Sequence, residues 1–407
     1  MKVWIKYLIG IAIGIITALI FPLDNAIGTS VFGFLTELFI RFGRYLVVPI
    51  VFSTAIVAIN KLRNSKILLK SSAWTFSIII VSTLILTIVG IVSILVVKLP
   101  RIPITVEVPS EILDLDIKNM VLSLFPYSAF DVLKEGSFLL VSFLFAALIG
   151  WESSSDLVVY KPVFKLAESA SQLFYHIAVF FTEIMAILII AISCNWIITF
   201  RSAFLSGIYT PLIIMLLVDF ILVVGVIYPL IIRFVCHDPH PYKVLYASIA
   251  PMLLAFFGGD ANLSLPLNIR HGKESLGIKR RSSGFTYPLF SIFARGGAAL
   301  VSSISFILIW RSYSSLPFTD ILWLFGMVVG LSFLLGGLPS GGVFVLLTIL
   351  CEQYGKGFDT SFLLLKPAAI ILCSFGNLFD TVTAMFGSYI VAVKTKMLEH
   401  HKIQHYI

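Results

Sequence analysis

Four ionisable side chains interrupt long uncharged runs of this sequence, and they are the first residues to which chemistry can be assigned. They are Asp219, Asp260, Arg295 and Asp380, and uncharged runs of 9 to 17 residues flank each of them. A charge in the apolar layer of a membrane costs at least about 2.5 kcal/mol, so each needs a partner or a function. We expect Arg295 to pair with Asp380 or Asp260, which leaves at least one carboxylate to bind a cation or a proton. A purely structural ion pair between packed helices is the alternative.

Two apolar segments carry helix-breaking residues in their middle, and such breaks would position a binding site. The first is Gly258–Pro266, and the second is Gly336–Gly342, which lies in an uncharged stretch from Ile321 to Cys351. That stretch suits two short helical arms better than one straight span, so we expect re-entrant helical hairpins at about 244–272 and 321–352. Unwound backbone at membrane depth survives where it lines a cavity, as at the midplane site of a transporter. A pair of glycine-rich kinks without a ligand is the alternative.

The composition places these segments in an integral membrane protein. Of the 407 residues, 59% are hydrophobic and only 12% are charged, too few to cover a soluble domain. The net charge is +8, and the basic residues are placed along the chain as expected of loops that set the orientation of a membrane protein. They do not predict a nucleic-acid-binding face. The four cysteines are widely spaced, and the motifs of nucleotide hydrolases, zinc proteases and serine hydrolases are missing from the sequence. We therefore predict no metal site, no cofactor and no enzyme activity.

Basic residues predict which side of the membrane each loop faces. Basic clusters lie at 61–70, 270–281 and 394–402, as the positive-inside rule expects of cytoplasmic segments. The acidic, proline-rich linker 99–119 is predicted to lie outside. The uncharged run Tyr7–Leu23 follows two lysines without a small-residue cleavage site, which predicts a first transmembrane helix rather than a signal peptide. We predict a multi-pass protein of the cell membrane with both termini in the cytoplasm.

The segment Phe39–Phe52 (FIRFGRYLVVPIVF) resembles the second-helix signature of the dicarboxylate/amino acid:cation symporter family, the glutamate transporter homologues. The resemblance continues along the chain at Tyr7–Pro22, Phe125-Pro126, Ala255–Phe257 with Leu265-Pro266, Gly337–Pro339 and Ile390–Thr395. It implies an all-α polytopic fold of eight transmembrane helices plus two re-entrant hairpins, arranged as homotrimers. Residues 1–200 would form mostly the scaffold and the trimer contacts. Residues 201–407 would form the transport core, which the third helix, at about 71–97, would join.

The resemblance also implies where a solute would bind. The first hairpin tip falls on Asp260, Ala261 and Asn262, and the second tip falls on Gly337, Leu338 and Pro339. In the eighth helix, the family's amine-binding Asp, its carboxylate-binding Arg and two of its sodium ligands fall on Ser374, Asn377, Thr381 and Met385. Because Asn377 replaces the arginine, this position has no guanidinium group to bind the second carboxylate of an acidic amino acid. This disfavours an acidic amino acid as the cargo.

The family's sodium ligands are largely missing at the matching positions. The seventh-helix Asn and Asp fall on Ala294 and Gly296, and the substrate-contacting threonine falls on Ala298. Sodium needs hard oxygen ligands, so three-sodium coupling is disfavoured. A backbone carbonyl site near Ser332 and Leu335 would remain possible for sodium.

Coupling, if any, would then use protons. Asp380 and Asp260 are the candidate carriers, and Arg295 and Asp219 complete the predicted charge relay. Arg295 would act as a tethered replacement for a bound cation.

Three functions fit these observations. The leading one is a secondary active transporter of a small organic solute, such as an amino acid or carboxylate, with non-standard or no sodium coupling. A transport-inactive relative with a structural or sensing role is the second, and an intramembrane enzyme is a weaker third. The predicted partners are the solute, the lipid bilayer and two further copies of the chain, and not nucleic acid.

Overall fold

The computed structural model describes residues 2–20, 26–102, 139–156, 158–313, 318–337, 342–399 and 406. Within these ranges the chain is helical, and the only β-type pairing is an isolated bridge between Ile278 and Leu398. Several residues that carried the sequence predictions lie outside the described residues. They are Phe21-Pro22, Phe125-Pro126, Leu338, Pro339 and most of the predicted outside linker, 103–119.

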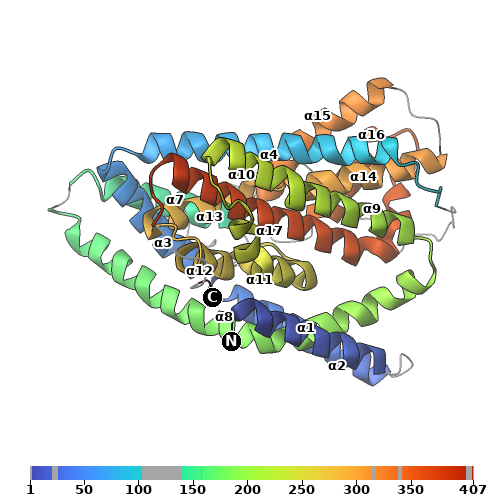
Figure 1. Cartoon of the computed structure of the whole chain (residues 1–407), viewed down its shortest axis with the longest axis horizontal. Coiled ribbons are helices and arrows are strands. Elements are labelled where there is room, and N and C mark those ends of the chain that lie inside the picture. The colour runs from blue at the N-terminus through green and yellow to red at the C-terminus, as the bar shows by residue number, and fades with distance from the viewer. Residues whose placement is uncertain are drawn as a thin grey trace.

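The first half of the chain forms six described helices (Figure 1). They are α1 (Val3–Ile20), α2 (Ala26–Arg44), α3 (Val47–Asn64), α4 (Leu68–Val96), α7 (Leu139–Glu152) and α8 (Lys161–Leu205). The predicted boundary at residue 200 falls inside α8, which continues to Leu205, because no glycine or proline lies between Pro162 in its first turn and Gly207.

The second half contains the helices that are broken. It begins with a long unit of α9 (Thr210–Phe220), the π-helical turn η1 (Ile221–Ile227) and α10 (Tyr228–Cys236). The remaining elements are α11 (Tyr242–Gly258), η2 (Asn262–Ser264), α12 (Leu265–Glu274), α13 (Arg280–Phe293), α14 (Gly296–Tyr313), α15 (Phe318–Leu334), η3 (Leu335–Gly337), α16 (Gly342–Tyr354), η4 (Ser361–Ala368) and α17 (Ala369–Lys394).

The helices are interrupted at both glycine-rich segments that the sequence singles out. Helix α11 ends at Gly258, Gly259 takes a left-handed conformation with φ of 63°, and α12 begins at Leu265. That conformation suits glycine, which has no Cβ to clash. The second interruption follows α15 and ends where α16 begins at Gly342. In each case the two flanking helices pack against each other, α11 on α12 and α15 on α16.

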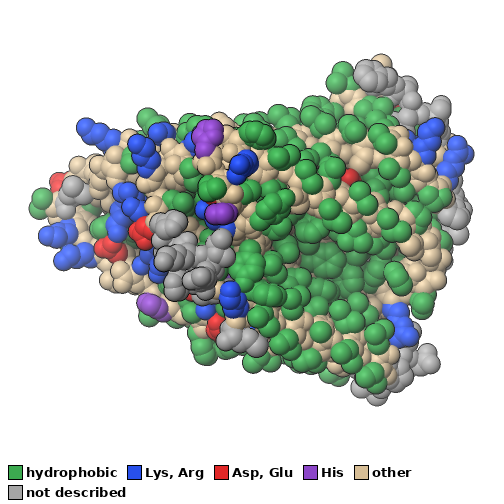
Figure 2. Space-filling view, in the orientation of Figure 1, with side chains coloured by type: hydrophobic (Ala, Val, Ile, Leu, Met, Phe, Trp, Pro, Cys, Tyr) green, Lys and Arg blue, Asp and Glu red, His purple; other side chains and the backbone are tan. Residues whose placement is uncertain are grey.

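Seven helical stretches of the described chain are long and apolar enough to cross a membrane. They are Val3–Ile20, Ser30–Asn64, Leu68–Val96, Lys161–Arg201, Thr210–Cys236, Arg280–Tyr313 and Ser361–Lys394. Apolar side chains cover the middle of the face in Figure 2, whereas Lys and Arg gather mainly at one end and in a smaller group at the other. This distribution confirms a polytopic membrane protein with an apolar belt between two charged ends.

The broken pair α13–α14 lies at the centre of the protein. In the apolar 18-residue stretch of this pair, 94% of the residues are buried inside the protein, whereas the corresponding share is 33–61% in the other six spans. Helix α17 packs on α11, α13 and α14, and α4 lies along α14, while α1 and α2 lie along α8 (Figure 1). The predicted ionisable residues Arg295 and Asp380 therefore lie inside the protein rather than against lipid.

Candidate functional site

The site begins at the interruption between α13 and α14. Ala294 leaves the helical conformation (φ −82°, ψ 67°), Arg295 follows it, and α14 starts at Gly296. The backbone N–H of Gly297 donates a 2.7 Å hydrogen bond to Asp380 Oδ1, which comes from α17. A helix N-terminus carries unsatisfied N–H groups and a partial positive charge, and a carboxylate satisfies both. Asp380 is thus the anion at the start of α14.

Arg295 lies beside the same carboxylate. Its Nη1 is 3.9 Å from Asp380 Oδ2, and the two side chains are only 6% and 4% exposed. The separation is too long for a hydrogen bond, and neither Arg295 Nε nor Asp380 Oδ2 has a hydrogen-bond partner among the described residues. Of the two carboxylates considered for Arg295, Asp380 is therefore the neighbour. The pair leaves one acceptor and one donor unsatisfied.

Asp260 has a different partner, which the sequence analysis missed. Arg44, the last residue of α2, places its Nε 2.5 Å from Asp260 Oδ2, and Asp260 Oδ1 accepts a hydrogen bond from the Asn262 N–H. Asp260 is therefore not the partner of Arg295. A sequence signal existed, since α2 carries two arginines and only Arg41 has an acid one turn away, at Glu37.

Both chain interruptions converge on this region. At the first, Ser264 Oγ lies 3.1 Å from the hydroxyl of Thr381, which follows Asp380 in α17. At the second, a Cβ added to Gly336 would lie 2.9 Å from the carbonyl oxygen of Ile292, and one added to Gly342 would lie 3.6 Å from Ala298 Cβ. The ends of α13 and α14 thus face the second interruption, while Thr381 faces the first.

The remaining predicted solute-binding residues lie on α17 and at the first tip. Ser374 accepts a 2.8 Å hydrogen bond from the indole N–H of Trp196 in α8, a residue that the sequence analysis did not select. Asn377, three residues after Ser374 in α17, is 6% exposed. Ala261 and Asn262 are buried next to Asp260. Ser374, Asn377 and Asn262 supply hydroxyl and amide groups rather than charges.

Asp219 stands apart from this group. Its carboxylate accepts a 3.0 Å hydrogen bond from Ser93 Oγ of α4, and no cation of the described residues forms an ion pair with it. It precedes the π-helical turn η1, a feature that often occurs where a helix is locally distorted for function. Its place in the predicted charge relay is not supported by a contact.

Comparison with known proteins identifies the relatives of this arrangement. Residues 3–396 match the family model described as the Sodium:dicarboxylate symporter family. The chain belongs to this family. A stretch of 121 residues is 30% identical to the Neutral amino acid transporter B(0) of Bos taurus and 29% identical to that of Homo sapiens. In both cases the stretch is 30% of this chain and spans only 22% of the relative.

In this member of the sodium:dicarboxylate symporter family, side chains near the positions where the resemblance places sodium ligands contact other groups of the protein. The described residues contain no group of three His, Cys, Asp or Glu that could hold a metal ion. Met385, where the resemblance places a sodium-ligating aspartate, instead accepts a hydrogen bond from the buried Tyr287 hydroxyl over 3.4 Å. At the predicted backbone site, Ser332 Oγ donates to the carbonyl of Val329 within α15, and Leu335 is buried.

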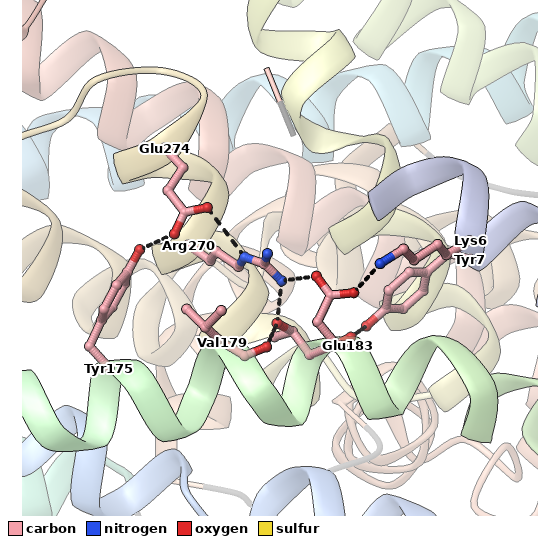
Figure 3. A network of polar contacts seen from close by, with 8 residues as sticks. Lys6, Tyr7, Tyr175, Val179, Glu183, Arg270 and Glu274 are labelled. Carbon is pink, nitrogen blue, oxygen red and sulfur yellow. Dashed lines mark hydrogen bonds and ion pairs between the residues drawn. The ribbon is translucent and has the colours of Figure 1, made fainter. Parts of the chain in front are cut away.

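A network of charged side chains holds α12, the helix that follows the first interruption (Figure 3). Arg270 of α12 contacts Glu183 of α8 over 2.8 Å and Glu274 over 3.4 Å. Glu183 also pairs with Lys6 of α1, and Glu274 accepts a 2.5 Å hydrogen bond from the Tyr175 hydroxyl. This network ties α12 to α1 and α8. The helix that follows Asp260 is therefore fixed at its far end by ion pairs between the two halves of the chain.

Gly297 allows Asp380 to reach α14. A Cβ at this position would lie 2.4 Å from both Gly376 O and Phe379 Cβ, and 2.8 Å from Asp380 Oδ1. We expect Gly297→Ala to destabilise the protein by about 1–3 kcal/mol, because rigid backbone is among the clashing groups. Thermal unfolding in detergent measures this. Gly326→Ala, where an added Cβ meets nothing within 4 Å, is the matched control, and an equal loss in both variants would contradict the close approach.

Proposed function

We propose that this protein is a secondary transporter that carries a small neutral amino acid across the cell membrane. The observation that carries the proposal is that two helix interruptions contact residues next to one buried ion pair, Thr381 on one side and the ends of α13 and α14 on the other, inside a polytopic membrane protein. Such interruptions supply backbone groups at membrane depth, which is how transporters of this kind bind solutes. The names of the relatives support an amino acid as cargo. Asn377, in place of an arginine, favours a neutral one.

The proposed topology has eight transmembrane helices and two re-entrant hairpins. The hairpins are α11–η2–α12 and α15–η3–α16, whose arms are each shorter than a full span. The first half of the chain would form the scaffold of a homotrimer, and the second half would form the moving core. The packing of α4 along α14 supports its place in that core. Both termini would lie in the cytoplasm.

We propose that the coupling ion is the proton. The sodium-ligating side chains are replaced by Ala294, Gly296 and Met385, and a carboxylate at this depth can bind a proton instead. Asp380 Oδ2 has no hydrogen-bond partner among the described residues, so a proton can be added there without breaking a hydrogen bond, at the cost of the charge attraction to Arg295. In this scheme Arg295 takes the place of a bound cation beside Asp380.

Uptake by proteoliposomes tests both statements. We expect labelled neutral amino acids to accumulate when the outside is made acidic, and we expect an imposed sodium gradient to add nothing. Asp380→Asn keeps the shape but cannot exchange the proton, so its uptake should fall to that of protein-free liposomes. Arg41→Gln, a change on the exposed face of α2, should transport like the parent. Uptake that follows sodium and ignores pH would contradict proton coupling.

A second candidate function is a transport-inactive role in structure or sensing. The Tyr287–Met385 hydrogen bond favours it, because it fills a position where a transporter of the family would bind an ion. Under this alternative, no gradient drives uptake, yet an amino acid that binds still raises the melting temperature of the detergent-solubilised protein. Uptake and stabilisation measured on the same preparation separate the two functions.

A further inference from the structure

A polar cavity lies away from the proposed transport site, among basic side chains of the kind that gather at one end of the molecule in Figure 2. Its volume is about 100 Å³, and four helices line it, namely α3, α8, α12 and α13. This volume corresponds to about three or four water molecules. The cavity can therefore hold one compact polar group.

The lining of this cavity is strongly positive. Lys61, Lys273, Arg280 and Arg281 face it, and the only acid in the lining is Glu168, which pairs with Lys61. No carboxylate of the described residues forms an ion pair with the other three cations. The cavity therefore holds an excess of three positive charges.

These three cations are held by contacts that do not neutralise them. Lys273 Nζ lies over the ring of Tyr175 at 4.1 Å from its centre, and Arg280 donates a 3.1 Å hydrogen bond to Ser171 Oγ. Arg281 donates to Ser65 Oγ over 3.4 Å, while its buried Nε has no hydrogen-bond partner. Cations that are half-buried together repel one another and lose solvation. An anion would relieve both costs.

The backbone adds to this preference. Helix α13 begins at Arg280, its N-cap residue Lys279 makes no side-chain capping bond, and the first turn contributes Arg280, Arg281 and Ser283 to the cavity. The N–H groups at a helix N-terminus favour negative charge. Burial and the charge of Arg280 also lower the pKa of Lys273, although Glu274 and Glu399 nearby act to raise it.

We propose that this cavity is a binding site for a phosphate-type oxyanion. Two guanidinium groups and an ammonium group match the oxygens of a phosphate, which arginine binds through paired hydrogen bonds. The anion would be a free phosphate or the phosphate of an anionic lipid headgroup, since both present the same group. It would bridge α3 and α8 of the first half of the chain to α12 and α13 of the second.

Thermal unfolding of the full-length protein in detergent tests the site, with inorganic phosphate as the probe and chloride at matched ionic strength as the reference. A ligand that binds only the folded state raises the melting temperature, and we expect a rise of about 2 °C or more. The double variant Arg280→Gln with Arg281→Gln should lose this rise. The control Lys70→Gln with Lys165→Gln removes two exposed basic residues of α4 and α8 outside the cavity and should keep it.

Phosphate also stabilises proteins generally by exclusion from their surface, and the comparison separates that effect. An equal rise in the parent and in the cavity variants would overturn the proposal. If the double variant does not fold, Lys273→Gln alone should still lose most of the rise.

Nanodiscs identify the source of the anion. If phosphatidylglycerol in phosphatidylcholine discs stabilises the parent but not the cavity variant, the ligand is a headgroup. If only added inorganic phosphate does so, the ligand is soluble. No stabilisation by either would refute the site.

Discussion

Replacing Arg44 by alanine is expected to destabilise the protein by about 3–5 kcal/mol, the cost of leaving one partner of a buried ion pair unpaired. Arg44 Nε is 2.5 Å from Asp260 Oδ2, and the Asp260 side chain is only 3% exposed. Truncating the arginine leaves a buried carboxylate without its cation, and the desolvation cost of that charge is then not offset. Denaturation of the purified protein in detergent measures the loss.

The same helix supplies the control for this prediction. Arg41 pairs with Glu37 one turn earlier in α2, and both side chains are more than 60% exposed. An exposed pair of this kind contributes only about 0.3–0.5 kcal/mol, so Arg41→Ala should have little effect. Adding Asp260→Asn to Arg44→Ala should restore part of the stability, because it removes the unpaired charge. Equal losses of stability in Arg41→Ala and Arg44→Ala would show that the buried Arg44–Asp260 pair contributes no more than the exposed Arg41–Glu37 pair.

The Arg44–Asp260 pair also shows where sequence reasoning stopped. Uncharged flanks identify Asp260 as a buried charge, because every charge in a membrane interior needs compensation. They cannot identify the partner, which is 216 residues away and lies at the end of a helix with three charged residues. The absence of an acid one turn from Arg44 marks it as a cation in need of a partner, but which carboxylate it meets depends on how the helices pack.

Features that depend on local sequence could be predicted, whereas contacts between helices far apart in the sequence could not. Both helix interruptions were predictable, since glycine and proline act on the backbone where they stand. The hydrogen bonds of Trp196 to Ser374 and of Tyr287 to Met385 were not, because each joins helices far apart in the chain. Asp219 was expected at membrane depth, and the structure shows it 3% exposed with the hydroxyl of Ser93, rather than a charge, as its partner.

The Arg295–Asp380 pair was predictable in part. The sequence suggested these two residues as possible partners, and the structure gives the distance between them. At 3.9 Å the charges attract each other, while Asp380 also holds the N-terminus of α14 through the Gly297 N–H. The carboxylate therefore has two roles, as counter-ion and as helix cap. Removing it should cost more than removing the arginine, since both roles are lost with it.

A double-mutant cycle on thermal stability separates these roles. We expect Arg295→Ala and Asp380→Ala each to destabilise the protein, and the double variant to lose less than the sum, with a coupling energy of about 0.5–3 kcal/mol. The control cycle pairs Arg295→Ala with Asp219→Ala, a buried carboxylate whose hydrogen bond is to Ser93. That cycle should be additive. Additivity in both cycles would show that Arg295 and Asp380 do not interact.

If Arg295 takes the place of a bound cation beside Asp380, the single variant Arg295→Ala should bind a cation in its place. Truncating the side chain leaves Asp380 Oδ2 facing the space that the guanidinium occupied, within a site whose anionic group still needs a positive charge. A small cation can then enter, because a carboxylate oxygen and the carbonyls at the break of α13–α14 are hard oxygen ligands. Sodium should therefore raise the melting temperature of Arg295→Ala but not that of the parent, with choline at the same ionic strength as the reference. Equal responses to sodium and choline in Arg295→Ala would mean that the arginine does not stand in for an ion, whereas a sodium response that disappears when Asp380→Ala is added would place the ion at this carboxylate.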